Sequence, residues 1–84
     1  PAPTEDKFKI ISKKNKELAT LEQEISEKEN EVRFLENEIA KEEIYSDAIK
    51  LQDHTRRYNS EKALLNQLQK NWEELAEEIM ELEG

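Results

Sequence analysis

Basic side chains that could contact a ligand gather in two places in this sequence. The first sixteen residues hold five lysines against Glu5 and Asp6, a net charge of +3, whereas the rest holds 8 basic and 19 acidic residues, a net charge of −11. The second place is Arg56 and Arg57, which stand beside Tyr58. Basic residues near an aromatic are one footprint of nucleic-acid contact. The candidate contact residues are therefore Lys7, Lys9, Lys13, Lys14, Lys16, Arg56 and Arg57.

Both basic segments also have a plainer interpretation. The lysine-rich start is equally suited to tether the chain to a neighbouring domain. Asp53 precedes Arg56 by three positions and Arg57 by four, so on a helix its carboxylate could neutralise them as part of a solvated face. The overall charge of −8 disfavours a polyanion along most of the surface, because phosphate repels an acidic protein. Nucleic-acid contact is thus a hypothesis about these two segments alone.

No set of residues in the sequence is suited to catalysis, to metal binding or to holding a cofactor. A phosphate-binding loop needs several glycines, and the only glycine is Gly84. There is no cysteine, and His54 is the only histidine, which leaves no converging His and Cys ligands for a metal. The carboxylates fit solvated helix faces with no apolar environment to raise a pKa. We expect no catalytic residue, no metal ligand and no cofactor in this chain.

The composition indicates long helices in a cytosolic protein. Charged residues make up 40% of the chain and hydrophobic residues 35%, and the only strong helix breakers are Pro1, Pro3 and Gly84. No apolar run reaches the roughly 20 residues that cross a bilayer, and the first residues do not form a signal peptide. We therefore expect a cytoplasmic protein with no membrane partner. Because the chain starts with Pro1 and not with Met, we also expect it to be part of a longer protein.

Apolar residues recur at alternating steps of three and four, the heptad spacing of a coiled coil. The first series has a positions at Ile11, Leu18, Ile25, Val32 and Ile39 and d positions at Lys14, Leu21, Lys28 and Leu35. The second series has a positions at Leu51, Tyr58, Leu65, Trp72 and Ile79 and d positions at His54, Glu61, Leu68, Leu75 and Leu82. The two registers do not match, because continuing the first would place Asp53, and not Leu51, at an a position. The chain therefore folds back between the two series.

The fold-back is expected near Tyr45 to Asp47. Ser46 and Asp47 are typical of an N-cap followed by an acidic residue in the first turn of a helix. The sequence thus predicts an all-α, two-helix antiparallel coiled-coil hairpin. Its expected parts are an N-terminal lead or linker over 1–9 and the hairpin over 10–84, with helix 1 at about 10–43, the turn at about 44–47 and helix 2 at about 47–83.

Folding the chain at this turn pairs every a position with a d position, as an antiparallel coiled coil requires. Lys28 and Glu61 then lie one layer apart, so we expect an ion pair between them that sets the register. Within the first helix we expect two further pairs at i, i+4, Glu24 with Lys28 and Glu29 with Arg33. A single seam is a thin core. We therefore expect a marginally stable monomer that self-associates weakly or is covered by other domains of its parent.

Four segments resemble one family, the C-terminal domains of ABC-F ATPases of the Uup type. They are the lead Ile11–Leu18, the leucine–glutamate repeat Leu21–Ile25, the tip Glu42–Asp47, and the closing Asn71–Leu75 with its Trp-Glu-Glu-Leu run. Lys13 stands where the family often has a tyrosine after the serine. The resemblance implies a parent protein with two ATP-binding cassettes that hydrolyses ATP, lacks membrane spans and acts on ribosomes or nucleic acid.

By the same resemblance, this hairpin contributes binding of DNA, RNA or the ribosome and supports the parent ATPase domains, which hold the ATP. Two other functions stay open. One is a purely structural dimerisation or tethering hairpin. The other is a tRNA-binding arm, which would need basic residues along one face of both helices, whereas the body of this chain is acidic.

Overall fold

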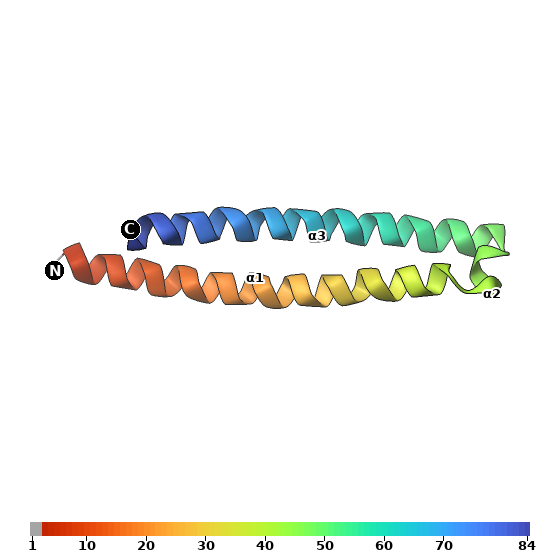
Figure 1. Cartoon of the computed structure of the whole chain (residues 1–84), viewed down its shortest axis with the longest axis horizontal. Coiled ribbons are helices and arrows are strands. Elements are labelled where there is room, and N and C mark those ends of the chain that lie inside the picture. The colour runs from red at the N-terminus through yellow and green to blue at the C-terminus, as the bar shows by residue number, and fades with distance from the viewer. Residues whose placement is uncertain (1–2) are drawn as a thin grey trace.

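The fold is a long helical hairpin, described for residues 3–84 in a computed structural model, with side chains described from Asp6 onward. Helix α1 spans Pro3–Ile39, the one-turn helix α2 spans Glu42–Tyr45, and helix α3 spans Ala48–Glu83. The helices α1 and α3 lie side by side and antiparallel, with α2 at the tip and both chain ends at the opposite end (Figure 1). The hairpin measures 65 × 16 × 14 Å. The all-α hairpin that the sequence predicts is confirmed.

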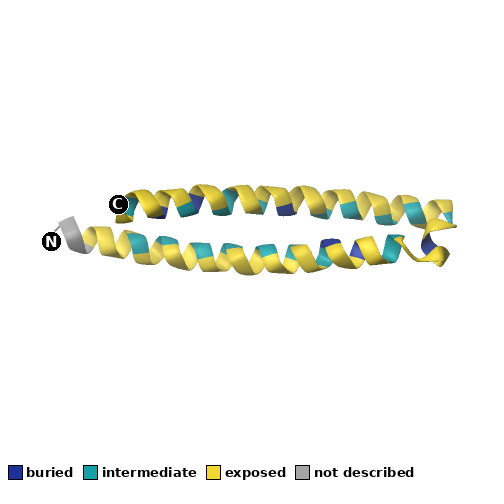
Figure 2. Ribbon diagram, in the orientation of Figure 1, coloured by how far each residue is buried: buried dark blue, intermediate teal, exposed yellow. Residues whose placement is uncertain are grey.

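The core is the single seam between α1 and α3 (Figure 2). Every a and d position of the two heptad series, from Ile11 to Leu82, is buried or half-buried. The buried apolar residues are Val32, Leu35, Ile44, Leu65, Leu75 and Ile79. All but Ile44 belong to the predicted stripes. Burial of these apolar side chains holds the two helices together, because neither helix has another face to bury.

Polar contacts across the seam show how α1 and α3 are aligned along the hairpin. The ammonium group of Lys28 lies 2.7 Å from a carboxylate oxygen of Glu61, as the sequence predicts. The Tyr58 hydroxyl donates to the Glu36 carboxylate at 3.2 Å. The predicted antiparallel pairing therefore holds along this part of the hairpin.

Helix α1 differs from the prediction at both ends. It begins at Pro3, whereas a linker was expected over 1–9 and a helix from about 10. Proline is tolerated in the first turn of a helix, and no breaker follows it, so the lysine-rich segment is helical. At the other end α1 stops at Ile39, and not near residue 43. The chain turns at Ala40 and Lys41, and the separate helix α2 then buries Ile44, which is 8% exposed, over the end of the seam.

The start of α3 also differs in one detail. Asp47, and not Ser46, is the N-cap, and its carboxylate accepts from the backbone N–H groups of Ile49 at 3.0 Å and Lys50 at 3.1 Å. These are amides that the first turn of a helix cannot satisfy by itself. The hydroxyl of Ser46, which follows the last residue of α2, instead donates to the carbonyl of Glu42, the first residue of α2. Ser46 thus closes one helix and Asp47 opens the next.

Within residues 3–84, no helix is long and apolar enough to cross a lipid bilayer.

Candidate nucleic-acid interface

The five lysines near the start of the chain divide into two groups once they are placed on α1. Lys9, Lys13 and Lys16 stand at i, i+4 and i+7, so they form one stripe along the helix, and all three are exposed. We call these three residues the lysine stripe. Lys7 and Lys14 occupy d positions and lie on the side of α1 that meets α3. The stripe could contact an external anion without disturbing the hairpin, whereas Lys14 could not.

Lys14 is held by α3. Its ammonium group lies 2.7 Å from a carboxylate oxygen of Glu78 and donates a hydrogen bond to it. This hydrogen bond raises the pKa of Lys14 above its ordinary value, with the nearby charges of Glu78 and Glu17 adding to the effect. Lys7 and Glu83 line one hollow together with Phe8 and Ile11. Both inner lysines thus face the acidic end of α3.

In the hairpin, the basic start of the sequence lies beside its acidic end. The end of α3 carries six glutamates, Glu73, Glu74, Glu77, Glu78, Glu81 and Glu83, and no basic residue. Because the helices are antiparallel, this end lies beside the lysine-rich start of α1 (Figure 1). The attraction stabilises the open end of the hairpin and leaves only the outward lysines available.

The outer face of α1, the side turned away from α3, carries few acidic residues. Between residues 9 and 37 its charged residues are Lys9, Lys13, Lys16, Arg33 and one acid, Glu27, all of them exposed. Exposed amide and hydroxyl side chains lie between and beyond them, among them Thr20, Gln23, Asn30 and Asn37. The other acids of α1 over this range flank the seam. A polyanion lying along the outer face would therefore meet a surface of net positive charge.

The carboxylates that flank the seam are placed by their contacts with α3 or the tip. Glu31 and Glu36 contact Arg57 and Tyr58 of α3, and Glu38 holds Lys41 at 2.7 Å. The other four line hollows beside α3 residues: Glu17, Glu22, Glu24 and Glu29. These positions alternate on either side of the apolar stripe. The acidic composition of α1 is thus confined to its inner edges.

The structure does not bring Arg56 and Arg57 together with the lysines. Arg57 approaches Glu31 of α1 at 3.8 Å, while Arg56 is exposed and lines a shallow hollow with Thr55 and Asn59. Glu78, the partner of Lys14, stands 21 positions after Arg57 on α3, or about 30 Å at ~1.5 Å per residue. Neither arginine is within 4.0 Å of Asp53, the partner that the helical spacing suggested. The predicted contact residues therefore form separate surfaces.

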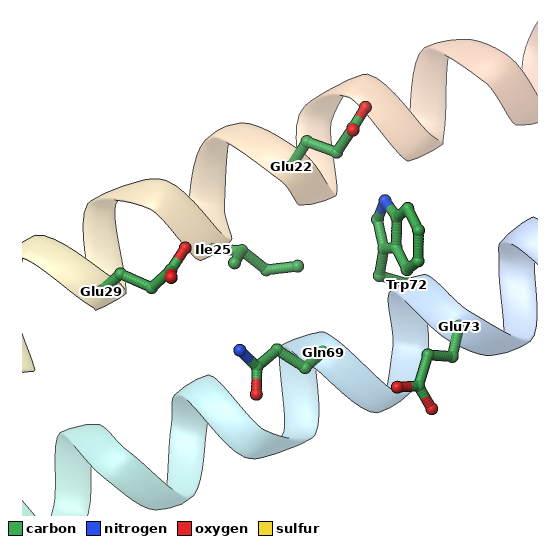
Figure 3. A pocket seen from close by; sticks show the side chains of 6 residues that line it. All are labelled: Glu22, Ile25, Glu29, Gln69, Trp72 and Glu73. Carbon is green, nitrogen blue, oxygen red and sulfur yellow. The ribbon is translucent and has the colours of Figure 1, made fainter.

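The two other side chains that could bind a ligand, His54 and Trp72, lie against the hairpin itself. The ring nitrogen Nδ1 of His54 lies 2.8 Å from the Lys50 carbonyl of its own helix. The ring of Trp72 projects from α3 toward α1 beside an open hollow, with Ile25 opposite and the carboxylates of Glu22 and Glu73 turned away (Figure 3). The indole N–H of Trp72 is buried without a hydrogen-bond partner. Within the described residues, no three His, Asp or Glu side chains are arranged to hold a metal ion.

Comparison with known proteins identifies one family. The family model described as the ABC transporter C-terminal domain matches residues 9–77. The matched segment runs from the lysine stripe through the tip and Trp72 to the acidic end of α3. No curated protein and no solved structure matches the chain.

Proposed function

The chain belongs to the family of ABC transporter C-terminal domains, and from this premise we propose that it is the C-terminal coiled-coil module of a cytosolic ABC-F, Uup-like ATP-binding protein. A helical domain of this family is not itself the ATPase site, so ATP would bind to other domains of the parent. We propose that the module binds DNA or RNA, free or in the ribosome, and thereby supports the parent ATPase.

The lysine stripe is the observation that carries the nucleic-acid proposal. Its three ammonium groups extend over seven residues, about 10 Å at ~1.5 Å per residue. Glu17 and Glu24 line the same hollow as Lys13 and Lys16, while the face beyond the stripe carries Glu27 as its one acid as far as residue 37. A row of lysines is a sequence-independent partner for phosphates, because each contact releases a counterion from the polyanion. The acidic faces of α3 stay on the far side of the hairpin. This arrangement reconciles a net charge of −8 with binding to a polyanion.

The test is a salt-dependent binding measurement. Fluorescently labelled DNA and RNA of about 20 nucleotides would be titrated with the protein at about 50 mM to 200 mM salt, the range in which phosphate contacts are progressively screened. The variant Lys9→Glu/Lys13→Glu/Lys16→Glu is expected to lose binding. If all three lysines contact a single strand, the salt slope of the wild type contains about two units from them, at ~0.7 per contact. Lys14 is left unchanged because its ion pair with Glu78 belongs to the fold.

A matched control reverses three exposed lysines of α3, as Lys50→Glu/Lys62→Glu/Lys70→Glu, with the same change in net charge. The control is expected to bind nearly as well as the wild type. Equal losses in both triple variants would show that only net charge matters and would remove the stripe from the proposal. A wild-type protein that binds no nucleic acid at low salt would end the nucleic-acid proposal altogether.

Tethering or dimerisation is a second candidate, and one observation favours it. The seam residues Leu18, Leu21 and Ile25 are only half-buried, so another helical surface could cover them further. Sedimentation over a range of protein concentrations, with and without nucleic acid, separates the two roles. The tRNA-arm alternative is disfavoured, since the outer face of α3 carries Asp53, Glu73, Glu74, Glu77 and Glu81 against only Arg56 and Lys70.

A further inference from the structure

Beyond the lysine stripe, the outer face of α1 ends in a cluster of four side chains: Asn30, Arg33, Phe34 and Asn37. Asn30 precedes Arg33 and Phe34 by three and four positions, and Asn37 follows them by four and three, so the four side chains are neighbours on one face of the helix. Phe34 is 52% exposed, whereas the adjacent Leu35 is 0% exposed in the seam. The cluster thus presents an aromatic ring, a guanidinium group and two amides to solvent. We call these four residues the Phe34 cluster.

The fold makes little use of the cluster. Phe34 is not at a seam position, and half of its surface is in water. Arg33 was expected to pair with Glu29, yet none of the ion pairs formed within 4.0 Å by the described residues includes Arg33. Phe34 and Arg33 therefore contribute little to the packing of α1 against α3. These side chains are free to contact a partner.

The chemistry of the cluster matches an unpaired base. An exposed aromatic ring stacks on the flat face of a base, a guanidinium group binds phosphate or stacks in the same way, and amides hydrogen-bond to base edges. In a duplex the base faces are covered by their neighbours, so a side chain on a convex helix surface cannot reach them. Only a single strand offers phosphates and bare base faces at the same time.

We propose that the outer face of α1 is a single-stranded nucleic-acid site, in which the lysine stripe holds phosphates and Phe34 stacks on a base. This inference rests on the proposed nucleic-acid function and narrows its ligand. Lys16 and Phe34 are 18 positions apart, about 27 Å at ~1.5 Å per residue, a length that several nucleotides span. The polar residues Thr20, Gln23 and Asn30 lie along the path. Glu27 is its one acidic side chain.

The test combines an affinity measurement with a direct readout of stacking. Phe34→Ala is compared with Leu64→Ala, because Leu64 is 51% exposed on α3 and so is a matched loss of exposed apolar surface. The probes are a labelled single strand of about 20 nucleotides, as DNA and as RNA, and a duplex of the same length. A single strand carrying 2-aminopurine reports stacking through quenching of its fluorescence.

Phe34→Ala is expected to weaken binding of the single strand by about 5- to 150-fold, the range of one lost base stack, with the salt slope unchanged. It should also abolish the quenching of 2-aminopurine, and Phe34→Trp should retain both. Leu64→Ala should bind like the wild type. Glu27→Gln should bind more tightly, because it removes the one repulsive charge on the path. The wild type should prefer the single strand to the duplex.

The outcomes separate this inference from the function on which it rests. If the lysine-stripe variant loses binding but Phe34→Ala does not, the nucleic-acid function stands and the stacking site is wrong. Equal affinity for duplex and single strand would likewise overturn it. If the wild type binds neither probe, the proposed function itself fails.

Discussion

Lys28 and Glu61 meet across the seam of the hairpin, with 2.7 Å between the ammonium nitrogen and the nearer carboxylate oxygen. Both stand at d positions that an apolar residue would normally occupy. The side chains keep 35% and 23% of their surface exposed, so neither charge is removed from water entirely. A partly hydrated ion pair of this kind can be accommodated in the seam. It favours this register over others, because a shift would leave a charge against apolar neighbours.

Reversing the charges of this pair one at a time should destabilise the hairpin. Lys28→Glu would place two carboxylates opposite each other, and Glu61→Lys two ammonium groups, so we expect a lower Tm in each single variant. The double variant Lys28→Glu/Glu61→Lys should recover much of the loss, because the attraction is restored with the opposite sense. Thermal unfolding followed by circular dichroism gives the comparison. Equal losses that simply add in the double variant would show that the two side chains do not interact.

High pH should weaken the hairpin through its lysines. Hydrogen bonds to Glu61, Glu78 and Glu38 raise the pKa of Lys28, Lys14 and Lys41 above the ordinary 10.5. A lysine with a higher pKa in the folded state contributes stability that is fully present below about pH 10.5 and lost as the pH rises through the folded value. The Tm should therefore decrease as the pH is raised through this range. In Lys28→Met the fall should be smaller, and an identical fall would exclude a contribution from this pair.

The packing of Leu35 should dominate the stability of its layer. Leu35 is 0% exposed, so Leu35→Ala should lower the free energy of unfolding by about 3 kcal/mol, within the usual range for a buried leucine. The neighbouring Phe34→Ala should change it by less than about 0.5 kcal/mol, because that ring is on the surface. Urea unfolding measures both. If Leu35→Ala is already unfolded in water, Leu35→Val should show an intermediate loss. Similar values for the two alanine variants would contradict the assigned rotation of α1.

As the N-cap of α3, Asp47 should contribute about 1 kcal/mol to the free energy of unfolding. Asp47→Ala leaves the amides of Ile49 and Lys50 without their carboxylate partner, whereas Asp47→Ser or Asp47→Asn keeps an acceptor there. We expect the alanine variant to lose stability and the other two to retain most of it. Asp53→Ala, on the exposed face of the same helix, is the matched control. A loss in Asp53→Ala as large as in Asp47→Ala would point to charge and not to capping.

The isolated hairpin is expected to be marginally stable and to self-associate weakly. Its one seam leaves several leucines half-buried, and a second copy could cover them. The Tm should therefore lie below about 70 °C and rise with protein concentration. A cooperative transition above that temperature, independent of concentration, would contradict the expectation.

Much of the fold could be predicted because heptad spacing is local. The steps of three and four from Ile11 to Leu35 and from Leu51 to Leu82 determine which face of each helix is buried. The change of register between them places the fold-back. The pairing of Lys28 with Glu61 follows from these two facts, because the position of the turn selects one among the alignments of the two stripes that differ by whole heptads.

Only the tertiary structure decided how the ends and the charges are arranged. The tip depends on the burial of Ile44 over the seam, which ends α1 at Ile39, starts a separate α2 and makes Asp47 the cap of α3. The lysine-rich start was one basic segment in the sequence. In the hairpin, Lys14 is turned to Glu78 while Lys9, Lys13 and Lys16 face solvent. The physical reason is that apolar periodicity is encoded along the chain, whereas the partner of a charge depends on which distant segment the fold places beside it.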